Sequence, residues 1–356
     1  MKRKLLVAVP LLCVVALLAW ILRPKHESIS DAYVSERSVT LWSSIAQVRE
    51  QLGVLLYGDH VDVLARHNEN VKVRTAAGVV GWVDGRYLMD PDLWQRSANL
   101  LKQASPIPVQ ARGRTKVPTN LRVQPGRNEP RLYQFSRNAP VEIVGRATAD
   151  WVQVSDEKET SGEPSETKKE DWFLIRGTAT RPPGEGVVRN SAITNTTQPG
   201  DQTIPIAGWV VARFVSLDLP EAVREGAESA NIRPLAWFEL NRVSDGQGEH
   251  PQYLAAGARG PEGMPCDFTT LRVYTWNTRK TRYETAFIDN NLCGAFPIRV
   301  SKDPKGQPEF RFLLSGEKGE RHYRLIQTVV RRIKDENPAA PSKSEKPKPI
   351  QSPSKK

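Results

Sequence analysis

One phrase in this sequence occurs twice, and it limits the fold more than any other feature. Residues 81–88 read Gly-Trp-Val-Asp-Gly-Arg-Tyr-Leu, and residues 208–215 read Gly-Trp-Val-Val-Ala-Arg-Phe-Val. Both copies place an arginine three positions after the valine and follow it with an aromatic and an aliphatic residue. A phrase repeated at this spacing predicts one structural unit that is used twice.

The segments before each phrase alternate apolar and polar residues, which predicts half-buried β-strands. These segments are residues 56–64 and 71–74 in the first copy and residues 134–144 and 151–154 in the second. After each phrase comes a short stretch that begins with proline, Pro91 or Pro220, with an acidic residue within two positions before it. Such a start predicts a short helix.

The order of turn, strands and closing phrase resembles the bacterial SH3-like domain. In the second copy, residues 120–126 read Asn-Leu-Arg-Val-Gln-Pro-Gly, close to the opening motif of that family, whereas residues 39–44 of the first copy fit it loosely. The resemblance implies two small β-barrels, over residues 33–90 and 114–218.

SH3-like barrels can hold extended peptides in an aromatic-lined groove, where flat rings give contact area at little entropic cost. The resemblance therefore implies ligand-binding rings, and packing in the barrel core is the alternative for each of them. The candidates are Tyr57, Trp82, Tyr87, Trp151, Trp172, Trp209 and Phe214.

The N-terminus carries an uncharged apolar run from Leu5 to Leu22. As a helix, eighteen residues span about 27 Å, close to the thickness of a bilayer core. The run lacks a small-residue cleavage site, so we predict an uncleaved single-pass membrane anchor, with a cleaved signal peptide as the alternative. Basic residues precede the run and place the N-terminus in the cytoplasm, so the bulk of the chain is predicted to be extracytoplasmic, either periplasmic or extracellular.

The rest of the chain divides by composition. The second repeat carries a long polar insertion, and a third unit of alternating strands follows it; its segments 282–287 and 291–297 resemble a C-terminal β module of bacterial envelope proteins. The predicted fold class is mainly β, with an N-terminal transmembrane helix, two SH3-like small β-barrels, a C-terminal antiparallel β domain and short linker helices. The predicted parts are an anchor (1–23), a linker (24–32), SH3-like domain 1 (33–90), a helical linker (91–113), SH3-like domain 2 (114–218, insertion 155–206), a linker helix (219–233), the C-terminal β domain (234–334) and a disordered basic tail (335–356).

Two of the three cysteines, Cys266 and Cys293, lie in the third unit. Outside the cytoplasm a disulfide between them is permitted, and two free thiols are the alternative. A catalytic pair of one of these cysteines with His322 or His250 is disfavoured, because neither cysteine begins a helix that lowers a thiol pKa. Metal-ligand spacings, phosphate loops and nucleophile elbows are absent from the sequence, so we predict no catalytic residue, no metal and no cofactor.

The formal net charge of +11 favours anionic partners. For an exterior protein these are wall polymer, lipid headgroups or an acidic protein, and nucleic acid is not expected. We predict a non-enzymatic, membrane-anchored binding or scaffolding protein of the cell envelope, whose SH3-like repeats bind peptidoglycan peptides or an envelope protein partner. Two alternatives stay open: a cell-wall-modifying enzyme with its site in the C-terminal β domain, and a cytoplasm-facing signalling adaptor.

Overall fold

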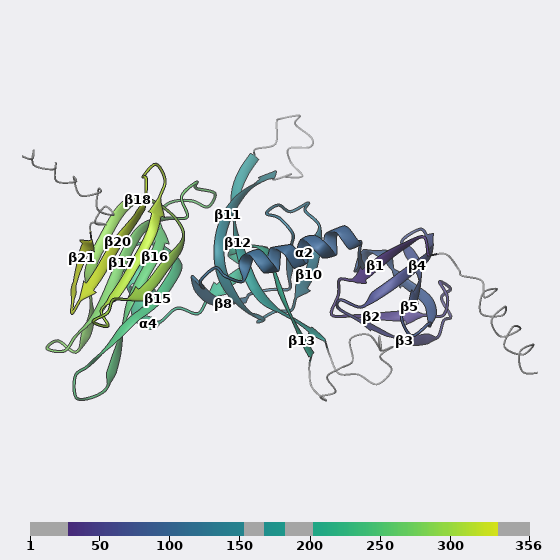
Figure 1. Ribbon diagram of the computed structural model, residues 1–356, viewed down its shortest axis with the longest axis horizontal. Helices are drawn as coiled ribbons and strands as arrows, with labels where there is room; N and C mark the ends of the chain where they lie inside the picture. The colour runs from purple at the N-terminus through teal and green to yellow at the C-terminus, as the bar shows by residue number, and fades with distance from the viewer. Residues whose placement is uncertain (1–27, 153–166, 182–201, 334–356) are drawn as a thin grey trace, which may run out of the picture. The chain divides into compact units, whose positions relative to one another are not determined.

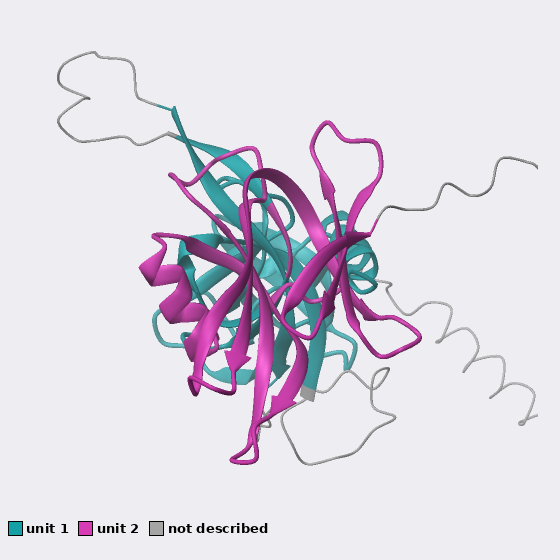
Figure 2. Ribbon diagram, turned by 90° about the vertical axis from the view of Figure 1, so that its left-hand side faces the viewer, with its two compact units in different colours: residues 1–107, 112–143, 147–216 teal, residues 108–111, 144–146, 217–356 magenta. Residues whose placement is uncertain are grey.

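The computed structural model describes residues 28–152, 167–181 and 202–333 (Figure 1). These residues form three antiparallel sheets of seven strands each, with two α-helices. The first two sheets and one helix belong to one compact unit (Figure 2). The third sheet and the other helix belong to a second unit, which also includes the short segments 108–111 and 144–146.

The first sheet has the strand order β3-β2-β6-β5-β4-β1-β7. Alternation along the strands turns Val61 and Val63 of β4 into the core, where neither is exposed, and leaves Asp62 on the outer face. A 3₁₀ turn, η1 (Gly85–Tyr87), joins the last two strands. The strands are β1 (Ser30–Val34), β2 (Ser38–Trp42), β3 (Gln51–Leu56), β4 (His60–His67), β5 (Asn70–Thr75), β6 (Val80–Asp84) and β7 (Leu88–Met89).

The second sheet repeats the first, strand for strand. Its order is β10-β9-β13-β12-β11-β8-β14, and the 3₁₀ turn η2 (Ala212–Phe214) again follows the strand that carries the repeated phrase. The two copies of the phrase thus occupy equivalent places, at the end of β6 and of β13. The strands are β8 (Ala111–Thr115), β9 (Thr119–Arg122), β10 (Arg131–Phe135), β11 (Pro140–Val152), β12 (Thr167–Arg181), β13 (Gln202–Val211) and β14 (Val215–Leu217).

Helix α2 (Pro91–Ala104) packs against strands of both sheets in the first unit. Its start is set by Asp90, whose carboxylate accepts a hydrogen bond from the backbone N–H of Leu93 at 2.7 Å, with Pro91 in the first turn. Trp94 stacks on Tyr33 of β1, with ring centroids 4.8 Å apart and planes 6° from parallel. The helix therefore fixes the outer face of β1.

The third sheet is a meander in which every strand pairs with its neighbour in sequence. Its core is rich in aromatic rings, among them Phe268, Phe310 and Phe312, and helix α4 (Glu221–Ser229) packs against β15 and β16. Cys266 and Cys293 form a disulfide in this unit. The strands are β15 (Arg233–Ser244), β16 (Glu249–Ala258), β17 (Phe268–Asn277), β18 (Arg282–Lys302), β19 (Pro308–Leu314), β20 (Glu320–Ile326) and β21 (Val329–Ile333).

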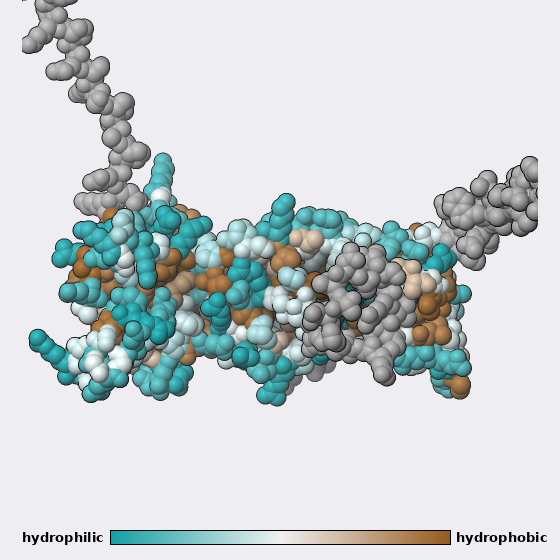
Figure 3. All heavy atoms as spheres, turned by 60° about the horizontal axis from the view of Figure 1, so that its bottom comes forward, coloured by the Kyte–Doolittle hydropathy of each residue, from teal (hydrophilic) through white to brown (hydrophobic). Residues whose placement is uncertain are grey.

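The predicted fold class needs one correction. The β-rich part fits, but no helix in the described residues is long and apolar enough to cross a membrane. Helix α2, the longer of the two described α-helices, has fourteen residues and extends for about 21 Å. The predicted anchor (1–23), the tail (335–356) and most of the insertion (155–206) lie outside the described residues. On the face shown in Figure 3, apolar residues lie as separate patches among hydrophilic ones.

Candidate functional site

A pocket of about 550 Å³ opens in the first unit. Strands of the first sheet form most of its wall, and β10 of the second sheet supplies the rest. This volume lies within the usual range for small-molecule sites. The side chains that matter for its chemistry are Glu36, Trp42, Arg49, Asp84, Tyr87 and Arg131.

Glu36 follows the end of β1 and is largely withdrawn from water, with 18% of its side chain exposed. Burial raises the pKa of this carboxyl above its ordinary value, while the charge of Arg131 acts in the opposite direction. The Glu36 Oε1 and Arg131 Nη2 atoms are 2.7 Å apart, so the two effects compete directly. We take burial as the stronger effect, because the arginine is itself partly open to solvent, which screens its charge.

Asp84, at the end of β6, has the opposite environment. Its carboxylate accepts hydrogen bonds from the backbone N–H of Arg86 at 2.9 Å and from Arg86 Nη2 at 2.7 Å. These bonds hold the pKa of Asp84 below its usual range. One pocket therefore contains a carboxyl group that keeps its proton more readily and a carboxylate that loses it more readily, which is how general acids and charged stabilisers are separated in hydrolases.

Aromatic rings complete the pocket wall. Arg49 lies over the ring of Trp42, with 4.3 Å between the guanidinium carbon and the ring centroid. Tyr87 enters from η1, within the first copy of the repeated phrase. Flat rings of this kind provide contact area for a ligand at little conformational cost.

The predicted ligand-binding rings do not gather in one groove. Tyr87 lines the pocket, and Trp82 lies beside it in the ladder as the cross-strand partner of Trp42. Tyr57 and Trp172 are each 1% exposed, which makes them core residues, and burial raises the pKa of Tyr57. For these two rings the alternative prediction, packing in the core, describes their position.

The remaining rings belong to the second sheet. Trp151 lies between two guanidinium groups, those of Arg127 at 4.3 Å and Arg213 at 5.4 Å from its ring centroid. Both arginines also pair with the buried carboxylate of Glu170. Phe214 lies 5.5 Å from the guanidinium of Arg213, and Trp209 is half-buried in β13.

Sequence reasoning missed Glu36, Trp42 and Arg131. The first two lie in or before the segment that fits the SH3-like pattern loosely, and Arg131 comes from the other repeat. Glu36 and Arg131 come from different repeats and meet only in the folded unit, so no sequence motif of fixed spacing contains both.

The disulfide removes the thiols that a cysteine–histidine pair would need. His322 instead pairs with Glu309 at 3.2 Å between Nε2 and Oε2. His250 lies 3.0 Å from Asp245 and stacks on Trp276. An enzyme site built on Cys266 or Cys293 is therefore not supported.

No family model matches the chain, and no curated protein matches it. Among solved structures, an NlpC/P60 family protein from Bacillus cereus matches 58% of this chain at 12% identity, with a TM-score of 0.20. The match covers 64% of the Bacillus protein, less than two thirds of its length. NlpC2 and NlpC1 from Trichomonas vaginalis each match 85% of this chain at 9% identity, with TM-scores of 0.17 and 0.16, and the matches cover 97% and 87% of those proteins.

The matched structures are NlpC/P60 proteins, which agree better with the alternative prediction, a cell-wall-modifying enzyme, than with a non-enzymatic binding or scaffolding protein. The prediction of a non-enzymatic protein is therefore not borne out. At TM-scores near 0.2 the matches carry no argument about chemistry, which rests on the residues of this chain.

Proposed function

We propose that this chain is an extracytoplasmic hydrolase that modifies the cell wall, with its active site in the pocket around Glu36 and Asp84. One observation carries the proposal: a carboxyl with a raised pKa and a carboxylate with a lowered pKa line the same pocket. Pairs of carboxyl groups in contrasting environments are the machinery of glycoside hydrolysis. The substrate class is therefore a wall glycan, and the bond cleaved is glycosidic.

In this proposal Glu36 is the general acid. Its proton passes to the oxygen of the departing sugar as the bond from that oxygen to the ring carbon breaks. Asp84 stays ionised and stabilises the positive charge that develops on the sugar ring. Water then adds to the ring carbon and returns a proton to the Glu36 carboxylate, so each turnover consumes one water and restores the acid.

Three further pocket residues position the substrate. Arg131 is held by Glu36 at one side of the pocket, and Trp42 and Tyr87 offer their rings to the sugar. Arg86 acts through Asp84, since its hydrogen bonds favour the charged form of that carboxylate. Arg86 is thus a positioning residue.

The compartment is part of the proposal. The disulfide between Cys266 and Cys293 favours an oxidising environment, as found in the periplasm or outside the cell. The resemblance of the sequence to bacterial SH3-like domains supports the same location.

The test is hydrolysis of purified, insoluble wall glycan by the full chain. We expect soluble fragments with new reducing ends, and we expect Glu36→Gln to reduce the rate by at least a hundredfold, because an amide cannot donate the proton. The matched control is Glu50→Gln, which changes an exposed glutamate of the same sheet region and leaves the rate unchanged.

Any of three results would overturn the proposal. Release of fragments with new amino groups and no new reducing ends would show that a peptide bond is cleaved instead. A wild-type chain that releases nothing, or a Glu36→Gln variant with full activity, would remove the pocket as the site of hydrolysis.

A further inference from the structure

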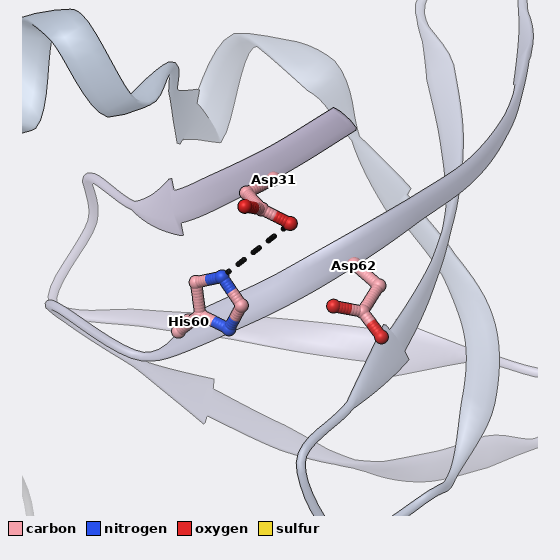
Figure 4. A group of neighbouring side chains, drawn as sticks. All are labelled: Asp31, His60 and Asp62. Carbon is pink, nitrogen blue, oxygen red and sulfur yellow. Dashed lines mark ion pairs between the residues drawn. The ribbon is translucent and has the colours of Figure 1, made fainter. Parts of the chain in front are cut away.

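A second group of side chains lies on the outer face of the first sheet, apart from the residues of the proposed active site. Asp31 of β1 and Asp62 of β4 are direct cross-strand partners, and His60 precedes Asp62 by two residues (Figure 4). Val61, which lies between His60 and Asp62 on β4, and Ala32, which follows Asp31 on β1, face the core. Strand alternation therefore places all three polar side chains on the same surface.

The donor atoms of these three side chains converge. One atom from each lies within 4.8 Å of the other two, and His60 Nε2 is 3.7 Å from Asp31 Oδ1. Arg74, the cross-strand partner of Asp62 on β5, approaches that carboxylate only to 3.8 Å. Two carboxylates placed directly opposite each other repel, and neither contact is short enough to be a hydrogen bond. A cation between them relieves this repulsion.

A separate observation concerns the histidine ring. Tyr33 packs against it edge to face, with centroids 5.2 Å apart, and Tyr33 is itself stacked on Trp94 of helix α2. The imidazole thus packs on one side against an aromatic pair. Contacts that orient a metal-ligating side chain increase the affinity of the site for the metal.

We propose that Asp31, His60 and Asp62 bind a divalent transition metal. One imidazole nitrogen and two carboxylate oxygens suit Zn²⁺, whereas Mg²⁺ and Ca²⁺ prefer sets of oxygen ligands. Zinc needs donor atoms about 2.0–2.2 Å away, hence about 3.4 Å from one another, so binding requires the three side chains to rotate inwards from their present spacing of up to 4.8 Å. The three protein ligands leave at least one position for water.

The test is titration of the metal-stripped full chain with Zn²⁺, followed by calorimetry. We expect one saturable site, weakened at least tenfold in His60→Ala and in Asp62→Asn. The matched control is His67→Ala, which removes an exposed histidine at the other end of the same strand and leaves the affinity unchanged. Circular dichroism of each variant separates loss of ligands from loss of fold.

The Arg74→Gln variant gives a second measurement, because it removes the cation that approaches Asp62. We expect it to bind Zn²⁺ more tightly than the wild type, whereas a purely structural role of the cluster predicts no gain. Equal binding by wild type and His60→Ala, absence of saturable binding, or equal affinity for Ca²⁺ would each overturn the proposal. None of these readouts depends on hydrolysis by the pocket.

Discussion

At the scale of single residues, the two pocket carboxyls set the pH range of the proposed activity. Glu36 must hold its proton, and its pKa is raised above 4.5, so the rate falls as the pH rises through that higher value. Asp84 must be ionised, and its pKa is lowered below 3.8, so the rate falls again only in stronger acid. We expect a bell-shaped profile with its maximum between these limits, measured as initial rates on wall glycan.

The ion pair with Arg131 gives this profile a specific test. Removing the positive charge in Arg131→Met takes away the largest effect that opposes burial, so the alkaline limb should move to higher pH while the acid limb stays in place. A profile whose alkaline limb does not move in this variant would show that another group controls it. Arg112→Met, which changes an exposed arginine of β8, serves as the control.

Single residues were also where the sequence was least informative. The repeated phrase pointed to its own rings, and of these Tyr87 alone reaches the pocket. Asp84 and Arg86 stand inside the first copy of the phrase, yet their pairing has no counterpart in the second copy, where Val211 occupies the aspartate position. There the equivalent Arg213 pairs with Glu170, which is far away in the sequence. The two copies of the phrase are therefore similar in sequence, but their arginines pair with different carboxylates.

At the scale of elements, the glycine that opens each phrase has a packing role. A Cβ atom on Gly208 would lie 2.6 Å from Leu121 Cγ and 2.8 Å from the carbonyl oxygen of Arg122. Strands β13 and β9 can therefore lie this close together only because residue 208 has no side chain. Gly81 has the same relation to Leu41 and Trp42 in the first sheet. Close backbone approach thus accounts for the glycine in both copies.

We expect Gly208→Ala to lower the free energy of unfolding by about 1–3 kcal/mol, the usual cost of overpacking. Urea denaturation followed by tryptophan fluorescence measures it. Gly248→Ala is the control, because nothing lies within 4 Å of the added methyl group there. Equal stability of wild type and Gly208→Ala would contradict the packing role.

The third sheet shows what strand patterns reveal and what they hide. The turn between β17 and β18 lies at residues 278–281, all of which are polar or charged. Strand β16 was not predicted, because its segment, residues 249–258, contains proline, glycine and three alanines, which are poor strand formers. Pairing with strands on both sides overrides that preference. In β18, Asn291 adopts a positive φ of 60° near a register shift, so residues that predict a turn are accommodated as an irregularity within one long strand.

At the scale of the whole molecule, a buried ion pair couples the two repeated sheets of the first unit. Asp59, between β3 and β4, pairs with Arg181 at the end of β12, and both side chains are buried. Burial raises the pKa of Asp59 above 3.8. The folded protein therefore holds that proton more tightly than the unfolded chain, so the contribution of Asp59 to stability falls as the pH rises from 3.8 through the folded pKa.

We expect Arg181→Met to lower the free energy of unfolding at pH 7 by about 3–5 kcal/mol, because it leaves a buried carboxylate without a counter-charge. The deficit should shrink towards pH 4, where Asp59 takes up its proton. Urea denaturation at both pH values provides the measurement, and the double variant Asp59→Asn/Arg181→Met should recover part of the loss. A deficit of equal size at both pH values would contradict this account.

The composition of the pocket wall has a consequence for any attempt to divide the chain. Arg131, which holds Glu36, belongs to the second repeat, while both carboxyls belong to the first. The first repeat alone supplies most of the wall but lacks the side that Arg131 and Gln134 form, so the complete pocket requires both repeats in one chain. The two repeats therefore act as one site-bearing body, although each has a sheet of its own.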